Sequence, residues 1–167
     1  RSEGHIRFYG VATWDGLRVP PGEANHLDLA RLWHLAESIG GPRHGFRWVQ
    51  APLNLGMPES FITPTQELDG QRLTLLEAAQ ALGISMQTSA SMLQGRILRS
   101  LEAQRAALDA VLPGCASAAQ LALQFTRSCP GVATALCGMG SKTHVEENLP
   151  VMALSKADPD ALRSLFA

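Results

Sequence analysis

The sequence predicts an α/β fold built of parallel strand–helix units. Four short apolar or β-favouring segments, at 6–11, 46–50, 85–89 and 132–137, alternate with segments whose apolar residues recur at helical spacing. Such alternation is typical of parallel sheets, in which each helix carries the chain back to the start of the next strand. The 167 residues, 46% of them hydrophobic, suit one domain with a buried core.

Caps and glycines mark the expected helices between these strands. The first helix runs from Asn25 or His26 to about Ile39, where two glycines end it. A capping box formed by Thr74 and Glu77 opens the second. The other expected helices are 97–112, one capped by Ser117 that ends before Pro130, 143–152 with a capping box at Thr143 and Glu146, and a short one after Asp158.

A long segment from Leu55 to Arg72 interrupts this regular pattern. It contains Pro58, Pro64 and Gly70 and is longer than a plain strand–helix connection needs. The sequence therefore predicts an irregular loop there, either a lid or a solvated surface feature.

The number of units decides between the two architectures that use them, an open doubly wound sheet and a closed (β/α)8 barrel. Gly138-x-Gly140 lacks the third glycine of a dinucleotide-binding turn, which weakens the first choice. A complete barrel needs about 250 residues. Four units in 167 residues predict half a barrel with its helices outside, and the start at Arg1 rather than a methionine leads us to expect a piece of a longer protein.

Composition excludes several classes of function. The net charge of -1 and the pI of about 6.6 provide no field that would attract nucleic acid or a membrane surface. No apolar run approaches the roughly 20 residues that span a bilayer, and no signal segment opens the chain, so we expect a cytoplasmic protein. The three cysteines form no CxxC pair and the five histidines show no ligand spacing, so no metal site is expected.

The segment from 130 to 148 has the pattern of a strand, a glycine turn and a helix start. Gly138 and Gly140 permit a sharp turn after the strand. The free N–H groups at the start of the following helix, together with Lys142, would suit a phosphate group. Many strand–helix turns carry such residues for geometry alone, so both interpretations stay open.

Five segments, in order along the chain, resemble the C-terminal half of the aldo-keto reductases, from the fifth barrel strand to the helix after the eighth. The resemblance implies a single partial domain of this family over residues 1–167, truncated on its amino-terminal side, with a (β/α)8 barrel in the complete protein. The matching segments are Gly4 to Trp14, Trp48 to Asn54, Gln94 to Leu98, Ala122 to Phe125 and Pro130 to Leu149.

The resemblance also implies hydride transfer between NADPH and a carbonyl substrate in the complete protein. The tyrosine, lysine, aspartate and histidine that perform catalysis in this family come from the half that is absent here. The only tyrosine of the chain is Tyr9, within a strand, and its only lysines are Lys142 and Lys156. We therefore expect no catalytic residue in this chain and no activity from the chain alone.

Most of the cofactor site of the family falls in the half that is present. Gln50 resembles the residue that binds the nicotinamide carboxamide, although a polar residue at a barrel end is the alternative. Thr13 and Ser89 stand where many members have an asparagine and a tyrosine. The other expected cofactor residues are Leu93 and Gly95 by the pyrophosphate, Ser141, Lys142 and His144 by the 2′-phosphate, and Glu147 and Asn148 by adenine, for which a solvated helix face is the alternative.

Two functions follow as expectations. The first is the cofactor-binding half of an aldo-keto reductase that uses NADP, with NAD as a second possibility because few basic residues remain near the 2′-phosphate. The second is a non-catalytic module that binds a nucleotide or completes a barrel with another chain. The reason for this second expectation is the open sheet, whose two unpaired edges favour self-association.

Overall fold

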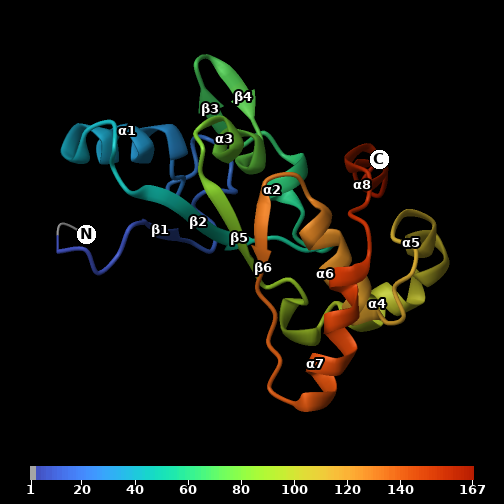
Figure 1. Ribbon diagram of the computed structural model, residues 1–167. Helices are drawn as coiled ribbons and strands as arrows, with labels where there is room; N and C mark the ends of the chain where they lie inside the picture. The colour runs from blue at the N-terminus through green and yellow to red at the C-terminus, as the bar shows by residue number, and fades with distance from the viewer. Residues whose placement is uncertain (1–2) are drawn as a thin grey trace.

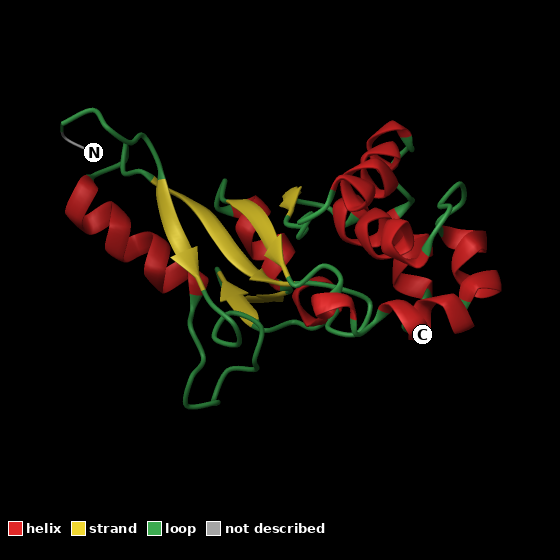
Figure 2. Ribbon diagram, turned by 90° about the horizontal axis from the view of Figure 1, so that it is seen from below, coloured by secondary structure: helices red, strands yellow, loops and turns green. Residues whose placement is uncertain are grey.

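A four-stranded parallel sheet forms the centre of the computed structural model, which describes residues 3–167 (Figures 1 and 2). The strands stand in the order in which they occur in the chain, and all three pairings are parallel. This confirms the prediction of parallel strand–helix units, and the sheet stays open rather than closing into a barrel. The strands are β1 (Tyr9–Ala12), β2 (Phe46–Pro52), β5 (Ser85–Ser89) and β6 (Val132–Ala135).

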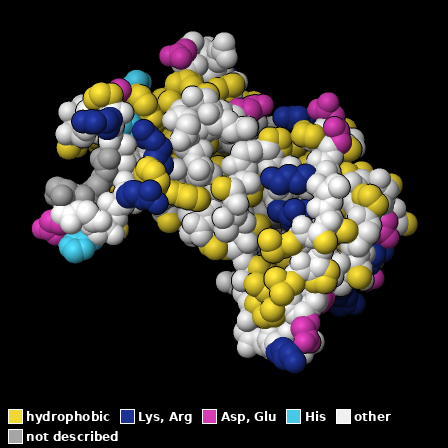
Figure 3. Space-filling view, in the orientation of Figure 1, with side chains coloured by type: hydrophobic (Ala, Val, Ile, Leu, Met, Phe, Trp, Pro, Cys, Tyr) yellow, Lys and Arg dark blue, Asp and Glu magenta, His cyan; other side chains and the backbone are white. Residues whose placement is uncertain are grey.

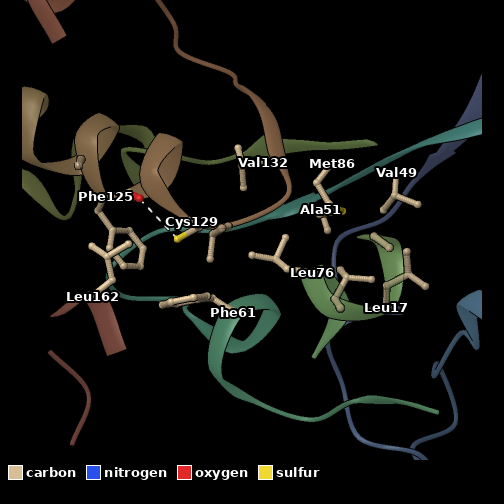
Figure 4. Close-up of a cluster of buried hydrophobic side chains, with 14 of the residues drawn as sticks. Leu17, Val49, Ala51, Phe61, Leu76, Met86, Phe125, Cys129, Val132 and Leu162 are labelled. Atoms are coloured by element: carbon tan, nitrogen blue, oxygen red, sulfur yellow. Dashed lines mark hydrogen bonds between the residues drawn. The ribbon is translucent and has the colours of Figure 1, made fainter. Parts of the chain in front are cut away.

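Alternation along the strands separates a core face from an open face. On β2, Val49 and Ala51 are fully buried, whereas the side chain of Gln50 points to the other face of the sheet. Figure 4 shows Val49, Ala51 and Met86 directed toward the side chains of Leu76 and its neighbours. The burial of this one face against the helices is the main source of stability for the chain.

Of the helices, α3 (Leu75–Ala81) lies against β5 and α6 (Ala118–Ser128) against β6, while α4 (Leu98–Ala103) and α7 (Lys142–Asn148) pack on α6. The capping box of Thr74 and Glu77 is present in both directions, and Ser117 accepts a hydrogen bond from the backbone N–H of Gln120, as the sequence predicts. No helix among residues 3–167 is long and apolar enough to cross a membrane. The helices of the regular units are α1 (Leu29–Gly40), α3 (Leu75–Ala81), α4 (Leu98–Ala103), α5 (Arg105–Val111), α6 (Ala118–Ser128), α7 (Lys142–Asn148) and α8 (Pro159–Ser164), with 3₁₀ turns η1 (Leu93–Gly95) and η2 (Leu149–Ala153).

Helix α1 and the helix predicted over 97–112 differ from the prediction. Helix α1 begins at Leu29 instead of Asn25 or His26, because the carboxylate of Asp28 accepts a hydrogen bond from the backbone N–H of Arg31 and caps the helix. The helix expected over 97–112 is divided into α4 and α5, because the backbone leaves helical geometry at Gln104.

The segment from Leu55 to Arg72 is ordered rather than irregular. It forms helix α2 (Glu59–Ile62) and, with Leu73, a hairpin of β3 (Gln66–Leu68) and β4 (Gln71–Leu73), which turns at Asp69 and Gly70 in left-handed conformations. The hairpin packs beside α1 and α3. The segment is therefore part of the outer layer and not a lid over the strand ends.

Gln66 fastens this segment to the loop that precedes α1. Its side chain is 2% exposed, and its carboxamide oxygen accepts a hydrogen bond of 2.8 Å from the backbone N–H of Leu29. Its carboxamide nitrogen donates to the carbonyl groups of Leu17 at 2.8 Å and Leu27 at 3.2 Å. One buried amide thus satisfies three backbone groups, and one of them, the carbonyl of Leu17, also accepts from the hydroxyl of Thr65.

We expect Gln66→Ala to lower the free energy of unfolding by about 2 kcal/mol, because buried backbone groups then lose their partners. Urea denaturation measures the change. The matched control is Gln71→Ala on β4, where the side chain is exposed, and it should change stability by less than about 0.5 kcal/mol. Equal effects in the two variants would show that Gln66 does not hold the segment in place.

Candidate functional site

Two adjoining pockets lie beyond the carboxyl ends of β5 and β6. The first, here called the helix pocket, has a volume of about 460 Å³ and lies between the loop after β5, the start of α6, and α7. The second, the strand-end pocket, has a volume of about 320 Å³ and reaches from Ser89 to Gly138. Both are lined by Met92, Gln94 and Gly95, so they meet along this one loop.

The loop between the pockets has an unusual backbone. Leu93 and Gln94 adopt left-handed conformations with φ of 48° and 55°, and Gly95 follows with φ of 82°. Residues other than glycine rarely adopt this backbone region, and clusters of residues that do are typical of ligand sites. The fully buried Asn54 anchors the loop, since its amide nitrogen donates to the carbonyl of Ala90 at 2.9 Å.

Gln120 holds the two helical walls of the helix pocket at a fixed spacing. Its carboxamide oxygen accepts from the backbone N–H of Ala116 at 2.7 Å, just before α6. Its carboxamide nitrogen donates to the backbone carbonyl of Glu147 near the end of α7. Because Gln120 is only 5% exposed, both bonds are protected from competing water.

The start of α7 differs from the prediction. The hydroxyl of Ser141, not that of Thr143, caps the helix by accepting from the backbone N–H of His144 at 3.3 Å. The expected capping box of Thr143 and Glu146 is therefore wrong: both residues lie within α7 rather than at its cap. Glu146 instead forms an ion pair of 3.4 Å with Lys142, and both side chains are largely exposed.

Asn148 closes the inner end of the helix pocket. Its side chain is 6% exposed, and its amide nitrogen donates to the sulfur of Cys137 at 3.6 Å. Its amide oxygen is buried and has no hydrogen-bond partner among the described residues. A buried acceptor without a partner is costly, and this oxygen is closed to solvent although Asn148 itself lines the pocket.

Cys137 lines the strand-end pocket, and the carboxylate of Glu147 on α7 affects the pKa of its thiol. Burial raises the pKa of its thiol, and the negative charge of Glu147 raises that pKa further. Burial raises the pKa of the Cys129 thiol to about 12 in the core. Neither cysteine is therefore an activated nucleophile, and no cluster of three metal-ligating side chains occurs within residues 3–167.

A row of four register partners, three of them polar and here called the polar row, crosses the open face of the sheet. Ala12, Gln50, Gln87 and Thr134 are successive register partners on β1, β2, β5 and β6. Thr13 follows this row and donates its backbone N–H to the carbonyl of Gln50 at 2.9 Å. The hydroxyl of Thr13 is buried and has no hydrogen-bond partner among the described residues.

Some of the expected cofactor residues line the two pockets, some lie at the ends of β1 and β2, and some do neither. Gly95, His144, Glu147 and Asn148 line the helix pocket, and Ser89 lines the strand-end pocket. Thr13 and Gln50 lie together at the ends of β1 and β2. Leu93, Ser141 and Lys142 line neither pocket: Leu93 lies between Met92 and Gln94, which do, and Ser141 and Lys142 stand at the start of α7.

The residues that form one wall of the helix pocket were not predicted from the sequence. Ser117, Ala118 and Ala119 at the start of α6 line it, together with Leu98 of α4. The one feature of the sequence that could have indicated this wall is the pair of alanines that follows the helix cap Ser117, and such pairs are common in helices. Small side chains at this position leave room between α6 and α7.

Comparison of the fold with solved structures identifies the class of architecture. The aldo-keto reductase AKR11C1 from Bacillus halodurans matches in its holo form with a TM-score of 0.58 and 17% identity, and in its apo form with 0.56 and 17%. A thermostable aldo-keto reductase, Tm1743, solved with the inhibitor epalrestat, matches with a TM-score of 0.63 and 21% identity. Each match covers 98% of this chain.

The chain spans about half the length of these structures, since it covers 51%, 49% and 52% of them. No protein-family model matches the sequence. No curated protein matches it either. The chain therefore has the fold of about half of an aldo-keto reductase barrel.

We expect Ser141→Ala to loosen α7, because loss of an N-cap costs about 1 kcal/mol. Hydrogen exchange of the α7 amides should become roughly fivefold faster, since about 1.4 kcal/mol corresponds to a factor of ten. Thr143→Ala is the matched control and should leave the exchange rates nearly unchanged. A larger effect from Thr143 would mean that the helix begins where the sequence alone predicts.

Proposed function

We propose that this chain is the cofactor-binding half of an NAD(P)-dependent carbonyl reductase. The observation that carries the proposal is the pair of adjoining pockets that meet at one strained loop. Adenosine would occupy the helix pocket, and the pyrophosphate would pass Gly95, where the lack of a side chain lets phosphate oxygens approach the backbone. The dinucleotide would then continue into the strand-end pocket.

The lining of the helix pocket fits an adenosine group. Leu98, Ala118 and Ala119 offer apolar surface for a flat base, and a volume of about 460 Å³ is within the range of ligand pockets. A turn of the Asn148 side chain would let its unpartnered oxygen, now closed to solvent, accept a hydrogen bond from the exocyclic amine of adenine. Ser117 and His144 add polar groups at the rim for the ribose.

Thr13 and Gln50 are the residues we assign to the nicotinamide end. A nicotinamide cofactor supplies hydride transfer when bound. The carboxamide of Gln50 has a donor and an acceptor to offer to another amide, and the backbone N–H of Thr13 donates to the backbone carbonyl of Gln50. Together they would hold the ring in one orientation over the open face of the sheet. In the complete protein the substrate would be a small aldehyde or ketone.

Reduction of a carbonyl group also needs a proton donor for the forming alkoxide. Tyr9 stands at the start of β1, whereas the pockets lie at the carboxyl ends of the strands. The lysines, Lys142 and Lys156, lie on or after α7 and not on a strand. We therefore assign binding and orientation to this chain and proton transfer to groups outside it.

The chain should bind ADP with one-to-one stoichiometry in isothermal titration calorimetry, because the pockets for adenosine and pyrophosphate are made by its own residues. Ala118→Phe should weaken binding at least tenfold, because the new ring would occupy the helix pocket. Ala106→Phe, on the exposed side of α5, is the control. Thermal unfolding of both variants checks that they fold. Failure of the unmodified chain to bind ADP would contradict the proposal.

Exposed apolar side chains at both sheet edges favour a second candidate function, completion of a barrel with another chain. Beside β6, Met139, Leu149 and Met152 border a groove of about 330 Å³. Beside β1, Leu35 and Ile39 of α1 border a groove of about 240 Å³. Figure 3 shows hydrophobic side chains gathered over the segment between β6 and α7. Unpaired edges flanked by apolar surface favour association.

This second candidate predicts self-association of the purified chain. Sedimentation velocity should show species larger than a monomer whose share rises with protein concentration. Met152→Glu, which places a charge in the β6 groove, should shift the distribution toward the monomer. Ala106→Glu on α5 is the control and should not. A chain that stays monomeric at all accessible concentrations would argue against a barrel-completing role.

A further inference from the structure

The exposed apolar surface of this chain is confined to the two edges of the sheet. Every large hydrophobic side chain that is exposed among residues 3–167 belongs to one of two segments, 6–39 beside β1 or 136–152 beside β6. A partner that hides this surface from water must therefore cover both edges. The side chains are Ile6, Phe8, Tyr9, Trp14, Leu35 and Ile39 in the first segment, and Leu136, Met139, Leu149 and Met152 in the second.

The two edge strands match in length and direction. β1 and β6 each have four residues, and they stand at opposite sides of the sheet with all pairings between them parallel (Figure 1). The outer backbone groups of an edge strand are available for pairing with another chain. β6 of one copy can therefore pair in parallel with β1 of a second copy, in the way that β5 pairs with β6 within the chain.

An apolar ridge stands beside one edge and an apolar groove beside the other. On α1, Leu35 and Ile39 lie one helical turn apart and are 56% and 81% exposed. The groove beside β6 has a volume of about 330 Å³ and follows the strand from Ala133 to Met139, with Met152 on its outer wall. Aliphatic side chains from α1 of a second copy would fill this groove with apolar surface.

Symmetry decides how many copies meet in this way. A contact between two unlike edges is heterologous, and it repeats until the rotation closes a ring. The matches to solved structures cover 98% of this chain and about half of each barrel, so two copies complete one turn. The twofold axis must run along the strands, because an axis across them would pair one edge with its own copy and leave the other edge open.

From these observations we infer that two copies of this chain close into one parallel barrel, with β6 of each copy paired to β1 of the other. The inference rests on the second candidate function, barrel completion, and names a second copy as the partner. Four strands from each copy give the eight strands of a closed barrel. The strand-end pockets of both copies then open at the same end, and the two polar rows face each other inside.

Charged substitutions at the two edges test the contact between unlike edges. Ile39 and Met152 are the most exposed of the apolar side chains, at 81% and 76%, and one lies beside each edge. Ile39→Lys and Met152→Glu should each raise the dissociation constant of the dimer at least about tenfold, because each homodimer then buries two unpaired charges. Sedimentation velocity over a concentration series measures this constant. Ala106→Lys and Ala106→Glu, on the exposed side of α5, are the matched controls.

An equimolar mixture of the two variants supplies the decisive measurement. In a mixed pair, the new carboxylate of one copy faces the new ammonium group of the other at one junction, and the second junction is that of the unmodified chain. We therefore expect the mixture to recover dimer formation to within about threefold of the unmodified chain. Neither variant by itself has this complementary pair.

The outcomes distinguish this inference from the function on which it rests. Failure of the mixture to recover, or a dimer that Ile39→Lys leaves unchanged, would overturn the contact between β6 and β1. Species that grow beyond two chains would overturn closure of the ring and leave association itself in place. A monomer that forms a one-to-one complex with the amino-terminal half of the reductase Tm1743 would leave barrel completion, but with a different partner. A monomer that binds neither would overturn both the inference and the second candidate function.

Discussion

The pairing of β2 with its two neighbours is the interaction on which the rest of the structure depends. Its register places Val49 opposite Met86 and Gln50 opposite Gln87. Because side chains alternate along a strand, one register decides both the core and the open face. Val49 is buried against the helices, while Gln50 joins the polar row that we assign to nicotinamide. A slip of one residue would bury the amides and expose the core, so fold and candidate site are specified together.

Buried side-chain amides then position the elements around the sheet. Asn54 holds the loop between the two pockets, and Gln120 joins the walls of the helix pocket. Gln66 fastens the hairpin segment to the loop before α1. Each of these side chains is nearly inaccessible to water, so its bonds are strong and its removal is costly. The amides thereby turn irregular segments, which hydrophobic burial alone would leave loosely placed, into fixed parts of the structure.

An open sheet with a nucleotide-sized site explains why both candidate functions arise from one molecule. The pockets lie at the carboxyl ends of strands, where ligands of parallel sheets bind, and all their lining residues belong to this chain. The edges of β1 and β6, in contrast, have no partner strand among the described residues and are flanked by exposed apolar side chains. The two candidate functions therefore rest on different parts of the molecule, the proposed cofactor binding on the strand ends and the proposed association on the open edges.

The sequence by itself determined the features that depend on neighbouring residues. The four strands, their parallel order and the caps at Thr74 and Ser117 follow from local periodicity and local hydrogen bonds. Most residues of the candidate site were named only through the resemblance. Tertiary structure alone decided that residues 55–72 form an ordered layer, because the partners of Gln66 lie 37 to 49 positions away. It also decided that α6 forms a wall of the pocket, since distance in space, not position in the chain, sets which surfaces meet.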